Sequence, residues 1–155
     1  ISFRNKRAFK FGNARSFKAG GGMNELKVFT REEANQLIPT LTTLIQELNE
    51  KRERIADIEV EIDSLELVSD PEGERVPEGL ESLIQKHRKE VACFYEIVDQ
   101  IHSHGCLLKD VDTGLIDFFA LIEGRVVYLG WRFGEEQVHF WHEVGQGYAN
   151  RQPIS

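Results

Sequence analysis

Apolar residues recur every seven positions through residues 34–65 and predict one long helix. The repeat has two interleaved series: Ala34, Leu41, Leu48, Ile55 and Ile62 at one position, and Leu37, Leu44, Ile58 and Leu65 at the complementary one. Just before the repeat, Thr30 and Glu33 have the spacing of a capping box, in which each side chain bonds the other residue's backbone N–H. We therefore expect a helix that begins at Thr30 and ends near Val68.

A second apolar repeat predicts a second helix that ends at Gly105, a residue suited to a C-terminal cap. The repeat places Leu80, Phe94 and Ile101 at one heptad position and Ile84, Val91 and Val98 at another. His87 falls on this stripe, where we expect it to be packed and hydrogen-bonded. Residues 69–79 hold two prolines and two glycines among charges, which is typical of an exposed connection. Residues 30–104 should therefore form an antiparallel coiled-coil hairpin.

Two helices cannot fully enclose the apolar stripe between them. The C-terminal segment has about 50 residues, too few to cover helices of this length. We therefore expect a homodimer, or the binding of a partner protein, through the hairpin. The substitution Leu48→Asp, in the middle of the stripe, is expected to dissolve such a dimer.

After Gly105 the pattern changes to short apolar runs separated by turn residues. The strand candidates are Cys106–Asp110, Leu115–Phe118, Arg125–Arg132 and Gln137–His142, and the last two are rich in β-branched and aromatic residues. They predict a small antiparallel sheet over about residues 106–143, followed by a C-terminal tail, residues 144–155. Residues 23–155 are thus expected to form a single α+β domain, a long two-helix hairpin followed by a small antiparallel sheet.

The last two strands carry the candidate ligand-binding residues, Tyr128, Arg132, His139, Trp141, His142, Glu143 and Arg151. A turn at Gly134-Glu135 would pair Leu129 with Phe140 and Val127 with His142 on the core face. The outer face would then pair Gly130 with His139 and Tyr128 with Trp141. A loop one residue longer would exchange the faces of one strand. Arg132 and Arg151 could hold a carboxylate or phosphate in bidentate fashion. The sequence leaves open whether Asp117 lies close enough to belong to the same pocket.

This face has three interpretations: an aromatic sheet surface with arginine stacked on tryptophan, a ligand site, or an active site. An acid–base pair would consist of His139 or His142 with Glu143. No nucleophile motif or nucleotide-binding loop is present in the sequence, which favours a role without catalysis and leaves an enzyme as the alternative. The two histidines and Glu143 would share a face in a helix but not in a strand, so we expect no metal site and no cofactor.

The net charge of −7 is unevenly distributed. Residues 1–22 contain six basic residues and no acid, so the remainder carries a net charge of −13. A domain this acidic repels phosphate backbones, and we expect no nucleic-acid binding by the folded part. The basic segment could be an RNA-contacting arm or a targeting peptide. However, three glycines precede Met23, the sole methionine, so we interpret residues 1–22 as a non-native leader or added segment.

Further function classes are disfavoured by composition. No run of about 18 apolar residues exists that could cross a bilayer, so no membrane association is expected. Cys93 and Cys106 match neither a zinc motif nor a disulfide framework. We expect both cysteines to be small buried apolar residues in a reducing, cytoplasmic setting.

Five stretches of the chain form a recognisable combination: Phe29-Thr-x-Glu-Glu-Ala-Asn-x-Leu-x-Pro39, Lys109-Asp-x-x-x-Gly-Leu-x-Asp-Phe118, Val127-Tyr-Leu-x-Trp-Arg-x-Gly-Glu135, Trp141-His-Glu143 and Gly147-x-x-x-Arg-Gln-Pro-Ile154. In these stretches the chain resembles a family of bacterial domains of unknown function, the one numbered 2203. The resemblance covers residues 26–154 and implies no known activity. We expect a self-associating interaction or ligand-binding module, whose partner is a protein or a small anionic ligand; the alternative is a small-molecule-binding enzyme.

Overall fold

The protein folds as two long helices followed by a small antiparallel sheet. A computed structural model describes residues 26–68, 72 and 75–155, so the segment interpreted as a leader, residues 1–22, lies outside the described residues. The elements are α1 (Arg31–Val68), α2 (Leu80–Ser103), β1 (Leu107–Asp110), β2 (Leu115–Ile122), β3 (Arg125–Arg132), β4 (Phe140–Glu143), a short 3-10 helix (Tyr148–Asn150) and β5 (Gln152–Pro153). The predicted hairpin and the α+β class are confirmed.

Local sequence signals set the ends of the helices. The Thr30 hydroxyl accepts the Glu33 N–H at 3.1 Å, and the Glu33 carboxylate accepts the Thr30 N–H at 2.8 Å. This is the predicted capping box, and it satisfies two N–H groups that the first turn of α1 leaves without helical partners. At the end of α2, Gly105 has a φ of 92°, the left-handed conformation that glycine adopts at low cost.

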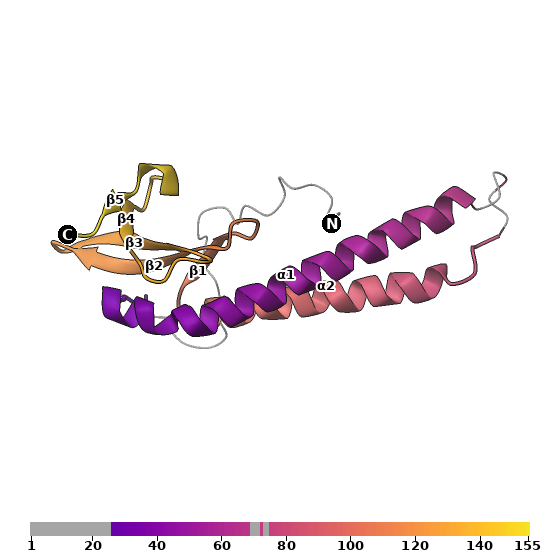
Figure 1. Cartoon of the computed structure of the whole chain (residues 1–155), viewed down its shortest axis with the longest axis horizontal. Helices are drawn as coiled ribbons and strands as arrows, with labels where there is room; N and C mark the ends of the chain where they lie inside the picture. Colours follow the sequence, from indigo (N-terminus) through magenta and orange to yellow (C-terminus); the bar gives the residue numbers. More distant parts are fainter. Residues whose placement is uncertain (1–25, 69–71, 73–74) are drawn as a thin grey trace.

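One hydrophobic core joins the sheet to the end of the hairpin where α1 begins and α2 ends (Figure 1). On the sheet, the core face presents alternate residues of β2 and β3, namely Ile116, Phe118, Ala120, Val127, Leu129 and Trp131. Cys106 is also buried, and burial raises the pKa of its thiol to about 12. Within the described part of the chain, no helix has the length and apolarity needed to cross a membrane.

The outer half of the hairpin has no comparable core. The buried residues of α1 end at Ile55, and those of α2 begin at Phe94. Figure 1 shows this half projecting away from the sheet. In it, the Nε2 atom of His87 lies 3.0 Å from Glu59 Oε1, so His87 is half-buried and hydrogen-bonded as expected. The heptad pattern therefore continues well beyond the part of the hairpin that the sheet covers.

Tight turns join the first three strands, which follow one another in an antiparallel sheet of five strands in chain order. Glu123 and Gly124, between β2 and β3, both have positive φ, 51° and 76°, as a two-residue type I′ turn requires. Gly114, between β1 and β2, has a φ of 64° and packs so closely on Phe133 that a Cβ atom would lie 2.5 Å from the Phe133 Cβ. The predicted turn at Val111–Gly114 is confirmed.

The register between β3 and β4 differs by one residue from the prediction. Tyr128 lies opposite His142 and Leu129 opposite Trp141, whereas we expected Val127 opposite His142. The reason is a contact with α1: the Val138 N–H donates to Asn35 Oδ1 at 2.8 Å. Val138 is buried beside α1 and β4 begins only at Phe140, so the connection cannot be the predicted two-residue turn. Because side chains alternate along a strand, His142 now faces away from the helices.

The contribution of the capping box to the free energy of unfolding can be measured. Thr30→Ala removes the hydroxyl that accepts the Glu33 N–H, and we expect the free energy of unfolding to fall by about 1 kcal/mol. Chemical denaturation followed by circular dichroism measures this change. Thr43→Ala is the control, because the exposed Thr43 hydroxyl only bonds back to the Pro39 carbonyl within α1. Equal losses in the two variants would contradict a role for the cap.

Candidate functional site

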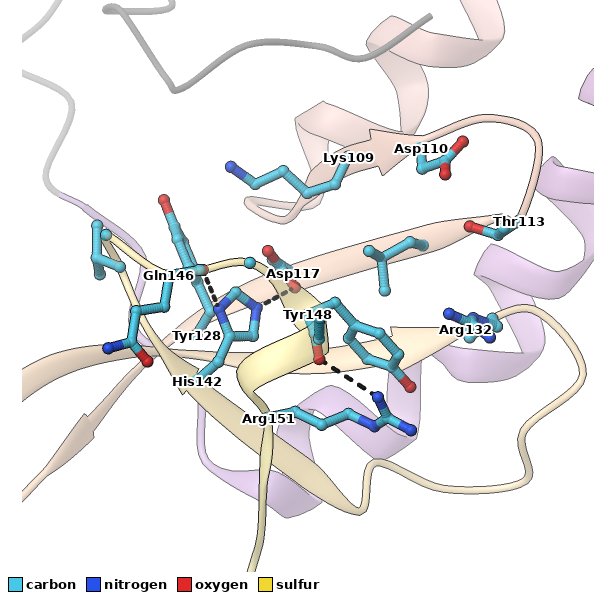
Figure 2. Close-up of a pocket in the computed structure, with 15 residues that line it drawn as sticks. Lys109, Asp110, Thr113, Asp117, Tyr128, Arg132, His142, Gln146, Tyr148 and Arg151 are labelled. Carbon is cyan, nitrogen blue, oxygen red and sulfur yellow. Dashed lines mark hydrogen bonds and ion pairs between the residues drawn. The ribbon is translucent and has the colours of Figure 1, made fainter. Parts of the chain in front are cut away.

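An open pocket of about 690 Å³ lies on the sheet face turned away from the helices (Figure 2). Its floor comes from β1 to β4, and one wall is the segment 144–151, which links β4 to β5. Its size is in the range of small-molecule sites. The lining residues are Lys109, Asp110, Thr113, Leu115, Asp117, Tyr128, Arg132, His142, Val144, Gly145, Gln146, Gly147, Tyr148, Ala149 and Arg151.

A buried ion pair lies at the base of the pocket. His142 Nε2 is 3.1 Å from Asp117 Oδ1, and the two side chains are 3% and 2% exposed. The other ring nitrogen, Nδ1, lies 2.8 Å from the Gln146 carbonyl and 3.1 Å from the Glu143 carbonyl. A carbonyl can only accept, so Nδ1 carries a proton and donates it. Opposite an ionised Asp117, Nε2 carries a second proton, which makes the ring an imidazolium.

The surroundings of His142 also favour the protonated form of its ring. Burial alone lowers this pKa, but the hydrogen bond and the charge of Asp117, with the carbonyls of Glu143 and Gln146, outweigh it and raise the pKa above its usual 6.5. Burial and the nearby Asp117 charge also raise the pKa of Tyr128, so its phenol stays protonated. The base of the pocket thus holds an ion pair of His142 and Asp117 next to a neutral phenol.

Tyr148 is the centre of the second part of the site. Two guanidinium groups lie over its ring, Arg151 at 4.4 Å and Arg132 at 4.8 Å from the ring centroid. The ring lies against β3 at Gly130, where an added Cβ would be 3.0 Å from Tyr148 Cε2. The space left by the missing side chain of Gly130 is therefore filled by Tyr148, and a larger residue there would displace the ring and the arginines that stack on it.

Glu135 fixes the position of these groups from the β3–β4 connection. Its carboxylate accepts the Arg132 backbone N–H at 2.9 Å and the Tyr148 hydroxyl at 3.3 Å. Its carbonyl accepts the Trp131 indole N–H at 2.9 Å, which ties the same residue to the core. Glu135 is therefore a positioning residue that connects the pocket to the packed side of the sheet.

Three long cationic side chains surround the pocket. The Lys109 ammonium lies 4.8 Å from the centre of the Tyr128 ring, and Arg132 and Arg151 stack on Tyr148. Among the described residues, none of the three forms an ion pair with a carboxylate. Stacking on an aromatic ring leaves the donating edge of a guanidinium open to a ligand. The Asp110 carboxylate also lines the pocket, so the three cations leave a net excess of positive charge there.

The structure brings together four of the seven candidate residues named from the sequence. Tyr128, Arg132, His142 and Arg151 line the pocket, as Figure 2 shows. Three lie elsewhere because the register of β4 is shifted. Trp141 packs against the core on the opposite face, exposed His139 lies 3.5 Å from an Arg31 nitrogen, and Glu143 pairs with Arg125 at 2.9 Å. Neither histidine forms the expected acid–base pair with the Glu143 carboxylate.

Several pocket residues are not among the candidates named from the sequence. Asp117 shares a face with Tyr128 and His142 once the true register is known, which answers the question that the sequence left open. Lys109 and Asp117 both belong to the stretch Lys109–Phe118 that carries the family resemblance, and this was the available signal. Tyr148 lies in a glycine-containing tail that gave no sign of packing on the sheet. Among the residues the structure describes, no three His, Cys, Asp or Glu side chains are grouped to hold a metal ion.

The buried pair predicts a specific pH dependence. Because the pKa of His142 is raised on folding, its stabilising effect is complete below pH 6.5 and is lost as the pH rises through the raised pKa. Asp117→Asn should lower the pKa of His142 and cost about 3–5 kcal/mol of stability at the acidic end, and less above. NMR titration of the imidazole and denaturation at several pH values measure both effects. Asp112→Asn is the control, because it removes a carboxylate that pairs with Arg52 at the exposed β1–β2 turn and should leave the pKa of His142 in place. An unchanged His142 pKa in Asp117→Asn would contradict the pairing.

Comparison with known proteins identifies a family but no activity. A search of curated proteins and a search of solved structures found no match. A family model described as "Uncharacterized conserved protein (DUF2203)" matches residues 27–154, nearly the whole described chain. The residues of the pocket base, Asp117, Tyr128 and His142, lie in this region. The chain belongs to the uncharacterised conserved family DUF2203.

Proposed function

We propose that the protein is a binding module whose pocket takes up a small anionic molecule carrying a carboxylate or phosphate group. The observation that carries this proposal is the convergence of Lys109, Arg132 and Arg151 on one pocket, without ion-pair partners among the described residues. The His142 imidazolium beneath them is ion-paired with Asp117, so the excess positive charge of the pocket comes from these three side chains. Unpaired cations around a concave surface are the usual means of holding an anion.

The net charge of the whole chain strengthens the case for an anion site, because the pocket has an excess of positive charge on a protein that is acidic overall. The protein has a net charge of −7, so a cationic pocket is not a by-product of a basic surface. Arg125, on the same sheet outside the pocket, has its carboxylate partner Glu143 at 2.9 Å. Repulsion among three cations has a cost in stability, which a bound anion would offset.

Binding without catalysis is favoured over an enzyme. A general base needs a free lone pair, and both ring nitrogens of His142 are engaged, one with Asp117 and one with carbonyls. The Glu143 carboxylate is paired with Arg125 and lies away from the pocket. An enzymatic role would require these contacts to rearrange when a substrate binds.

Anion binding can be tested with inorganic phosphate as the probe. We expect phosphate to bind, and Arg151→Gln or Lys109→Gln to weaken binding about tenfold or more, because hydrogen bonds between charged groups contribute about 1.5–3 kcal/mol. Isothermal titration calorimetry at low ionic strength measures the affinity, since salt screens exposed charges. Arg125→Gln is the matched control. Absence of binding, or equal loss in the control, would contradict the proposal.

A second role, self-association, is supported by the outer half of the hairpin. Beyond Ile55 on α1 and before Phe94 on α2, none of the described helix residues is buried. The half-buried residues Ile58, Ile62, Leu65 and Leu83 continue the stripe there. Val60 and Leu67 are 62% and 87% exposed. We propose that a second copy of the chain covers this half of the hairpin, as occurs in coiled coils.

Charge complementarity between the helices favours a copy of the same chain over an unrelated partner. The outer half of α1 is mainly acidic, with Asp57, Glu59, Glu61, Asp63 and Glu66. The outer half of α2 carries the basic residues Lys86, Arg88 and Lys89. A two-fold arrangement would set the acidic helix of one protomer against the basic helix of the other.

The test substitution selected from sequence, Leu48→Asp, is unsuitable because Leu48 is fully buried within one chain and its change would unfold the protomer. Val60→Glu combined with Leu67→Glu adds charge where the single chain is exposed. We expect sedimentation velocity to show a dimer for the wild type and a monomer for this variant. Thr40→Glu, an added charge on the exposed side of the packed half of α1, should remain dimeric. A wild type that stays monomeric at sub-millimolar concentration would contradict self-association.

A further inference from the structure

The outer face of the sheet continues past the pocket as an apolar surface. Side chains of one face alternate along β2 and β3, so Leu121 and Val126, which are paired, lie on the same face as Asp117 and Tyr128. Leu121 is 56% exposed and Val126 40%. Val144, just after β4, is 41% exposed and lines the pocket itself. We call Leu121, Val126 and Val144 the apolar shelf.

Two aromatic rings connect the apolar shelf to the cationic part of the pocket. Phe119 precedes Leu121 on the same face, and its ring centroid lies 4.9 Å from that of Tyr128. The Lys109 ammonium lies 4.8 Å from the Tyr128 ring centre. Along β3 the outer face therefore changes from Arg132, through Tyr128, to Val126, a span of roughly 20 Å at about 3.3 Å per residue.

We propose that the anion taken up by the pocket is amphiphilic, with a carboxylate or phosphate head and an apolar body that lies on the apolar shelf. This inference rests on the proposed anion-binding function and adds the class of ligand. Cations alone would suit inorganic phosphate. The apolar shelf adds exposed apolar surface, and its removal from water by a hydrocarbon body would be favourable. Charge complementarity places the head at Lys109, which lies over Tyr128, only two residues or roughly 7 Å along β3 from Val126, so the body is directed toward Val144, Val126 and Leu121.

The occupant is a single molecule in solution rather than a membrane surface. The pocket is concave, with a volume of about 690 Å³, and the wall 144–151 encloses it on one side. A bilayer would require the cations and the apolar residues to lie on one protruding surface. The Asp117–His142 pair and the Tyr128 ring, which lie at the base, are reached by a slender molecule and not by a planar array of head groups.

The experiment compares four probes by calorimetry: inorganic phosphate, butyrate, octanoate and 1-octanol. Each methylene that becomes buried strengthens binding roughly fourfold, so octanoate should bind at least tenfold more tightly than butyrate. 1-Octanol, which lacks the charge, should bind far more weakly than octanoate. Leu121→Thr combined with Val126→Thr should remove most of the advantage of octanoate while leaving the affinities for phosphate and butyrate unchanged.

Val60→Thr is the matched control, because it makes the same kind of change at an exposed apolar residue on the hairpin. Unchanged phosphate binding in the shelf variant shows that it is folded. Equal affinities for butyrate and octanoate would overturn the amphiphilic ligand and leave anion binding intact. No binding of any anion would overturn the proposed function itself, whereas equal binding of octanol and octanoate beside intact phosphate binding would overturn the amphiphilic ligand alone. Tight association with phosphatidylglycerol vesicles and none with monomeric octanoate would overturn the single-molecule occupant.

Discussion

The contact between the start of α1 and Val138 determines which side chains the fourth strand presents to each face of the sheet. The Asn35 amide oxygen accepts the Val138 N–H, and the Arg31 guanidinium donates to the Val138 carbonyl at 2.9 Å. Both backbone groups of Val138 are thereby used, and β4 has to begin beyond them. The side chain of His142 points to the outer face as a result, where it meets Asp117. A different anchor would direct Trp141 there instead and remove the pocket base.

The pocket combines fixed and adjustable electrostatics. The buried pair is shielded from solvent, so its charges are weakly screened and its geometry is set by backbone carbonyls. The charged ends of Lys109, Arg132 and Arg151 lie on aromatic rings and form no ion pair among the described residues, so these flexible side chains can turn toward a ligand. A site of this kind keeps its shape at the base and adapts at the rim.

Much of the fold follows from sequence because its signals are local. The capping box, the two helices and the Val111–Gly114 turn each depend on residues close together in the chain, and each is present as predicted. The register of β4 is set by Asn35, more than a hundred residues away, and turn rules contain no information about such a contact. That single error placed Trp141 and Glu143 on the face of the site, whereas the position of Asp117, which the sequence left open, follows from the pairing of β2 with β3.

The tail after β4 shows how little regular structure is needed to hold a wall in place. Strand β5 consists only of Gln152 and Pro153, and after it the Ile154 N–H donates to the His139 carbonyl at 2.9 Å. Ile154 also packs against the core, so the tail is held at its far end as well as at β4. The wall is thereby ordered before any molecule enters. Association would consequently lose little conformational entropy from the protein side, and even a weakly interacting compound could be retained.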